Sequence, residues 1–66
     1  MEEELNYLSE IINELEYDRD YNEREANKAE DIESRTYHNG KCCELNTEIE
    51  LLETILTAVT SFALTE

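Results

Sequence analysis

The residues best suited to chemistry lie together near the middle of the chain: His38, Cys42 and Cys43. On a helix, His38 and Cys42 share one face because they are four residues apart. Imidazole and thiolate both bind zinc, but a closed structural site needs four ligands, and the ligand spacing of zinc modules is missing. We therefore predict no metal site, with Cys42 in the helical core and His38 at the surface.

The cysteine and histidine side chains also have the composition of a nucleophile and its base. Nucleophilic catalysis further needs a group that orients the base, an oxyanion site and a pocket, and nothing in 66 residues indicates them. Carboxylate pairs abound, but on exposed helix faces they are solvated and lack the burial that perturbs acidity. The only glycine is Gly40, so there is no Gly-rich phosphate loop. The sequence predicts a protein that is not an enzyme and needs no cofactor.

Charge is distributed unevenly along the chain. The formal net charge is −13, and all five bases fall between residues 19 and 41. These bases are Arg19, Arg24, Lys28, Arg35 and Lys41. A chain this acidic lacks the cations that would release counterions from nucleic acid. It also lacks the cations that would attract the chain to an anionic membrane. The charge instead favours a basic protein as partner, including a groove that otherwise holds DNA or RNA.

The elements that must position these residues are helices. With no proline and one glycine, the chain lacks the turn chemistry of a β-protein. Apolar residues recur at spacings of three and four in two zones, residues 2–17 and 42–64, as on amphipathic helices. The first stripe is Leu5, Leu8, Ile11, Ile12 and Leu15, and the second is Cys42, Leu45, Ile49, Leu52, Leu56, Val59 and Ala63. The middle zone has few apolar residues, but the pairs Asp20/Arg24 and Asp31/Arg35 have the spacing and order of helical ion pairs.

The position of the chain reversal decides which stripes meet. Asn39-Gly40 is the obvious turn dipeptide, but a turn there would lay the second stripe against polar residues 19–33. A reversal between about 22 and 32 sets residues 5–15 opposite residues 45–55 and buries more apolar surface. We therefore predict one all-α domain over residues 1–66, an antiparallel helical hairpin. Its first helix covers about 2–20, the reversal lies in the twenties, and the second helix runs to about 64.

Two details of this hairpin stay open at the level of sequence. Asn22 with Glu25, and Asn27 with Glu30, each resemble a capping box that could start the second helix. Alternatively, the first helix is long and finds its partner on another protomer.

A lone hairpin has only one buried seam, which leaves little surplus over chain entropy. Adjacent cysteines rarely bridge to each other, so no disulfide reinforces the fold, and a reducing compartment fits best. We predict assembly into a homo-oligomeric helix bundle through the wide apolar face of the second helix. The residues assigned to that interface are Ile55, Leu56, Val59 and Phe62.

The sequence predicts a soluble, cytoplasmic protein, in the host cytoplasm if the chain is viral. Met1 is followed by three glutamates, the reverse of a signal peptide's basic start. The most apolar stretch, residues 55–64, is broken by hydroxyl side chains and is too short to span a bilayer.

Three functional hypotheses follow. In the first, a face with Glu10, Glu14, Glu44, Glu48 and Glu53 imitates nucleic acid and blocks a basic surface of a target protein. In the second, an oligomer sequesters a small phosphorylated nucleotide, because aromatic rings stack bases and cations hold phosphates. Its residues are Tyr21, Arg24, Lys28, Arg35, Tyr37 and Lys41. In the third, the protein is a structural or scaffolding subunit and its acids only keep it soluble.

In size and composition the chain resembles the small acidic helical accessory proteins of bacteriophages, including inhibitors of host defence enzymes. The resemblance rests on the whole chain and not on a motif, so no residue is assigned by it. It implies an inhibitor, which agrees with the first hypothesis.

Overall fold

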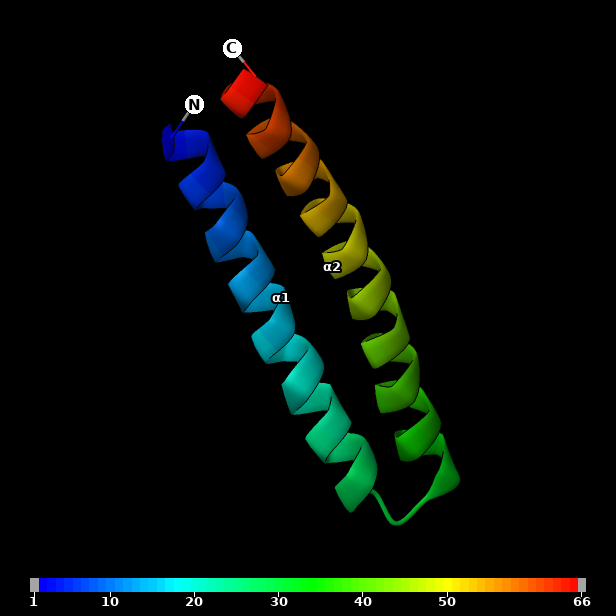
Figure 1. Ribbon diagram of the computed structural model, residues 1–66. Helices are drawn as coiled ribbons and strands as arrows, with labels where there is room; N and C mark the ends of the chain where they lie inside the picture. Colours follow the sequence, from blue (N-terminus) through cyan, green and yellow to red (C-terminus); the bar gives the residue numbers. More distant parts are fainter. Residues whose placement is uncertain (1, 66) are drawn as a thin grey trace.

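The protein is an antiparallel hairpin of two helices, seen in a computed structural model (Figure 1). The structure describes residues 2–65, and the side chains of residues 2–62. Helix α1 covers Glu2–Lys28 and helix α2 covers Ile32–Thr65, and the start of α1 and the end of α2 lie at the same end of the molecule. The result is a rod with Cα extents of 53 × 15 × 11 Å. The prediction of an all-α helical hairpin is confirmed.

Helix α1 is longer than the sequence predicted, because it continues through residues 21–28 before the chain reverses at residues 29–31. The N-cap of α2 is Asp31, whose Oδ2 accepts a hydrogen bond from the backbone N–H of Ser34 at 2.9 Å. The proposed capping boxes at Asn22 and Asn27 are therefore wrong: both residues lie inside α1. Asn22 is used within that helix, where its Nδ2 donates to the carbonyl of Asp18 at 2.8 Å.

The reversal is short because polar groups close both helix ends. The N–H of Ala29 donates to the carbonyl of Glu25 at 3.0 Å, which completes the last turn of α1. Arg35, in the first turns of α2, donates from Nη2 to the carbonyl of Ala29 at 3.0 Å. This bond satisfies a carbonyl for which the end of a helix has no partner of its own.

The two helical ion pairs expected in the middle zone do not form among the described residues. Asp20 instead pairs with its neighbour Arg19, Nε to Oδ1 at 3.4 Å. Arg35 is directed to the end of α1, and Asp31 caps α2. Pairs of this kind are worth only a few tenths of a kcal/mol, so helix ends with unsatisfied polar groups compete successfully for the same side chains.

The side chains between α1 and α2 form one helix–helix seam with a heptad spacing of alternating three and four residues, as in a coiled coil. On α1 these buried or half-buried positions are Leu5, Leu8, Ile12, Leu15, Arg19, Asn22 and Ala26, and Ala29 continues the spacing just past the end of the helix. On α2 they are His38, Cys42, Leu45, Ile49, Leu52, Leu56 and Val59. The predicted position Ala63 lies outside the described side chains. The seam is apolar toward the chain ends and polar toward the reversal.

Two hydrogen bonds fix the register of this seam. Nδ1 of His38 donates to Oδ1 of Asn22 at 2.8 Å, and Sγ of Cys42 donates to the carbonyl of Arg19 at 3.4 Å. Counting toward the chain ends at equal rates on both helices brings Ile12 opposite Ile49. These two, with Ala26, are the only buried hydrophobic residues in the described part of the chain. The apolar stripes therefore meet as the hairpin register predicted.

Gly40 lies within α2, and the described residues include no glycine with a positive φ. The turn signal of Asn39-Gly40 is thus overridden, because a turn there would have separated the two apolar stripes. Over the described residues, neither helix has a stretch long and apolar enough to cross a membrane.

Candidate functional site

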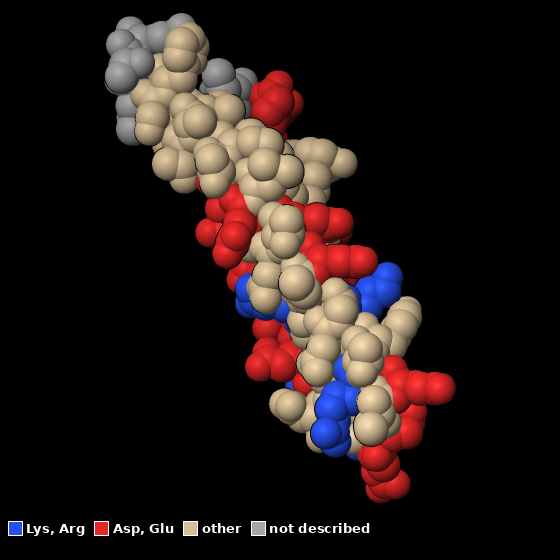
Figure 2. Space-filling view, turned by 90° about the vertical axis from the view of Figure 1, so that its right-hand side faces the viewer, with Lys and Arg blue, Asp and Glu red and all other residues tan. Residues whose placement is uncertain are grey.

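The hairpin brings the two base-free segments of the chain together. Residues 2–18 of α1 run beside residues 42–62 of α2, and we call these two segments the acidic arms (Figure 1). Their described acids are Glu2, Glu3, Glu4, Glu10, Glu14, Glu16 and Asp18 on α1, and Glu44, Glu48, Glu50 and Glu53 on α2. In Figure 2 the basic side chains are confined to the half of the rod nearer the reversal. The rod is therefore strongly acidic along the arms and nearly balanced in charge at the reversal.

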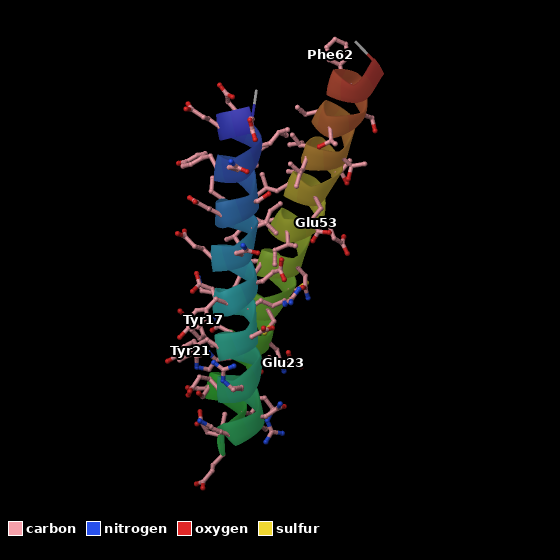
Figure 3. The ribbon with its side chains drawn as sticks, turned by 60° about the vertical axis from the view of Figure 1, so that its left-hand side comes forward. Tyr17, Tyr21, Glu23, Glu53 and Phe62 are labelled. Carbon is pink, nitrogen blue, oxygen red and sulfur yellow. The ribbon has the colours of Figure 1, made fainter. Side chains whose placement is uncertain are left out.

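All five acids assigned to the partner-binding face are exposed, but they do not share one face. Glu44 and Glu53 are nine residues apart, which at 3.6 residues per turn places them on opposite sides of α2. Glu53 lies on the same side of the hairpin as Glu23 (Figure 3). Glu10 is seven residues before Tyr17, so it shares the direction of that ring, which points away from α2 (Figure 3). Carboxylates therefore surround the arms.

The six residues of the nucleotide hypothesis do not converge within one chain. Tyr21 points away from α2 (Figure 3), and Arg24 and Lys28 follow it at helical spacings of three and seven on the same outer side. On α2, Nζ of Lys41 lies 5.7 Å from the centroid of the Tyr37 ring, a cation–π contact. The sixth residue, Arg35, is bonded to the end of α1. One protomer thus offers no common binding site to these groups.

The four residues assigned to the oligomer interface fall into two pairs. Leu56 and Val59 are half-buried in the helix–helix seam, so they already pack against α1. Ile55 and Phe62 remain exposed, with 42% and 61% of their surface accessible. Of the four residues, only this second pair is exposed.

The polar half of the seam was not foreseen as a unit. His38 was predicted at the surface, and this is wrong: it is half-buried, bonded to Asn22, with its ring in edge contact with Tyr37 at 5.2 Å between centroids. On the far side of the seam, Nη1 of Arg19 donates to Oδ1 of Asn46 at 3.1 Å. Continuing the spacing of Leu5 to Leu15 by steps of four and three residues reaches Arg19 and Asn22. This continuation of the heptad pattern is the sequence signal that could have predicted the polar half of the seam.

Cys42 occupies a seam position, as predicted, and its surroundings lower its reactivity. Loss of solvation, followed by the charge of Glu23, raises the pKa of the Cys42 thiol above its ordinary value. A thiol with a raised pKa is a poor nucleophile and a poor metal ligand at neutral pH. Cys43 is exposed. The described residues include no group of three or more histidine, cysteine or carboxylate side chains placed to hold a metal ion.

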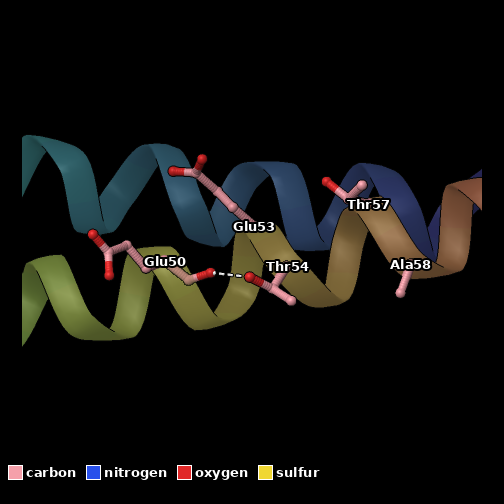
Figure 4. A pocket seen from close by; sticks show the side chains of 5 residues that line it. All are labelled: Glu50, Glu53, Thr54, Thr57 and Ala58. Atoms are coloured by element: carbon pink, nitrogen blue, oxygen red, sulfur yellow. Dashed lines mark hydrogen bonds between the residues drawn. The ribbon is translucent and has the colours of Figure 1, made fainter.

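The hollows of this rod are surface depressions. One, of about 460 Å³, is lined by Arg19, Asp20, Glu23, Asn39, Cys42 and Asn46. Another is formed by exposed side chains of α2 alone: Glu50, Glu53, Thr54, Thr57 and Ala58 (Figure 4). In the second hollow, Oγ1 of Thr54 donates a hydrogen bond to the carbonyl of Glu50 at 2.9 Å. Neither encloses a small molecule in the way that ligand sites usually do.

A scan against protein-family models, a search of curated proteins and a search of solved structures each found no match to this chain. Its function is therefore inferred from its own geometry, in which the acidic arms are the most distinctive feature.

Proposed function

We infer that the protein is a non-enzymatic binding protein whose acidic arms cover a basic surface of a target protein. The observation that carries this proposal is the pairing of two base-free segments by the hairpin. Had the chain formed one continuous helix, the same segments would lie at opposite ends, separated by all five bases. Folding instead concentrates the negative charge on one part of the rod.

The density of this charge suits a surface that normally binds nucleic acid. The longer arm, residues 42–62, rises by roughly 30 Å at 1.5 Å per residue. Eleven described carboxylates along that length give one charge for each 3 Å or so, the same order as B-DNA, which carries one per about 1.7 Å of axis. Because these side chains surround the arms, a basic groove that embraces the rod would meet carboxylates on each wall.

Charge of this kind acts mainly on association and specificity. Complementary potentials steer the encounter of two proteins and raise the association rate, and salt screens the effect. The proposed inhibitor would thus compete with nucleic acid for its target most strongly at low ionic strength. A target with an acidic or neutral surface would be rejected.

The test compares two variants with equal changes in net charge. In the arm variant, Glu10, Glu14 and Glu53 are replaced by Lys; in the matched control, Glu23, Glu30 and Glu33 near the reversal are replaced by Lys. The immobilised native protein should capture basic proteins from a cell lysate at 50 mM salt, and added duplex DNA should displace them. The control should retain this capture and the arm variant should lose it. Equal capture by both variants, or capture that salt and DNA leave unchanged, would contradict the proposal.

A further inference from the structure

The exposed apolar residues in the second half of α2 form a second stripe beside the seam. Leu51, Ile55, Ala58 and Phe62 follow one another at spacings of four, three and four, and all four are exposed. We call this set the Ile55 stripe. A helix with one heptad stripe packs against one neighbour, and a second adjoining stripe of the same period is typical of a helix with two neighbours.

The Ile55 stripe lies on the flank of the hairpin opposite the hollow that contains Asp20 and Asn46. Ile55 is nine residues from Asn46, and Ile11 of α1 is nine residues from Asp20; each separation is half a revolution. Ile11 and Tyr7, one turn before it, therefore face the same flank as Ile55. The seam register brings these two α1 residues to the same height along the rod as residues 49–54. Both helices thus contribute apolar surface to this flank.

The exposed area of the hairpin points to a missing neighbour. The chain exposes 5214 Å², whereas a compact protein of its mass is expected to expose about 4,400 Å². The difference of roughly 800 Å² is about the area that one partner buries in a standard protein interface. Only three hydrophobic side chains in the described residues are buried, so a cover over the exposed apolar surface would stabilise the hairpin.

We propose that this cover is a second copy of the chain, packed antiparallel on the Ile55 stripe about a two-fold axis near Ile55. The charges on the same flank decide the orientation. Toward the reversal, the stripe's spacing continues through Glu48 and Glu44, both exposed. A parallel copy would place each of these carboxylates beside its own counterpart, an unfavourable arrangement. An antiparallel copy with its axis near Ile55 places Glu48, seven residues before Ile55, opposite Phe62, seven residues after it, so neither carboxylate lies beside its own counterpart.

This dimer goes beyond the proposed function, and its test needs no target. Sedimentation equilibrium of the native chain at micromolar concentration should give twice the chain mass of 7.8 kDa. Ile55→Glu should raise the dissociation constant at least tenfold. Thr57→Glu is the matched control, because it adds the same charge to the same helix on the other flank, and it should leave the mass doubled. A native chain that sediments as a monomer, or equal dissociation by both variants, would overturn the proposal.

The orientation is tested with the exposed thiol of Cys43, spin-labelled in a Cys42→Ser background. Cys43 and Ile55 are separated by about 18 Å of helix rise, so an antiparallel dimer holds its two labels at least about 36 Å apart. A parallel dimer would hold them at the same height, within roughly 20 Å given interaxial distances of 8–10 Å. A pulsed electron-spin distance near 36 Å or more supports the proposed dimer, and a distance near 20 Å overturns it.

Discussion

Replacing Gly40 by alanine should stabilise the protein, and the result tests where the chain reverses. Gly40 lies in α2 without a positive φ and is exposed, and apart from its chain neighbours and the nearby backbone of its own helix no atom lies within 4 Å of the position that a Cβ would take. Alanine therefore brings no clash and removes the entropic disadvantage of glycine in a helix, which is about 1 kcal/mol. For a domain of this size, that gain corresponds to a rise in melting temperature of roughly 4–8 °C.

The assay is thermal unfolding followed by circular dichroism at 222 nm, with all variants at one protein concentration. Asn39→Ala provides a second reading, because Asn39 is also exposed within α2 and should be replaced without loss. If Asn39-Gly40 were instead a turn, both substitutions would lower the melting temperature, since alanine does not replace glycine at positive φ without strain. A fall for both variants would therefore refute the hairpin register on which the acidic arms and the Ile55 stripe depend.

Three further outcomes follow from the described contacts. Asp31→Ala should remove the cap of α2 and lower stability by about 1 kcal/mol; an unchanged melting temperature would contradict this role. Sodium chloride should raise the melting temperature, because it screens repulsion within like-charged pairs four apart, such as Glu10/Glu14 and Glu44/Glu48; a fall with salt would mean that ion pairs dominate. Iodoacetamide at neutral pH should modify Cys43 before Cys42, as peptide mass spectrometry would report. Because the pKa of Cys42 is raised in the folded protein, its contribution to the free energy of unfolding is fully present below the ordinary thiol pKa. That contribution is lost as the pH rises through the folded-state pKa.

The helices and their pairing could be predicted from the sequence because burial decides them. The spacing of Leu5 to Leu15 and of Leu45 to Leu56 defines two stripes, and only a reversal before Asn39-Gly40 lets them meet. The end of α1 was placed too early for a related reason. Residues 19–29 continue the heptad spacing with Arg19, Asn22 and Ala26, which apolar content alone does not reveal as interior positions.

The individual roles of the polar residues were less predictable, since each depends on a partner distant in sequence. Pairing Arg35 with Asp31 was reasonable from their spacing. Arg35 instead binds a carbonyl at the end of α1, and no local sequence pattern predicts that contact. In the same way, His38 was predicted at the surface because its partner, Asn22, lies sixteen residues away on the other helix.

The polar half of the seam also explains how so strongly charged a chain can form a defined hairpin. Hydrogen bonds such as Asn22–His38 and Arg19–Asn46 specify which residues lie opposite each other, while they add little to the net free energy of folding. The stabilising burial must then come from the apolar half, the same end that carries the acidic arms and the Ile55 stripe. Mutual repulsion of the arms weakens this end, and a second copy on the Ile55 stripe would strengthen it by burying apolar surface. Because the two-fold axis lies near Ile55, the two sets of acidic arms would overlap at the centre of this dimer and the two reversals would form its ends, so the dimer would present one broader acidic surface to a basic target.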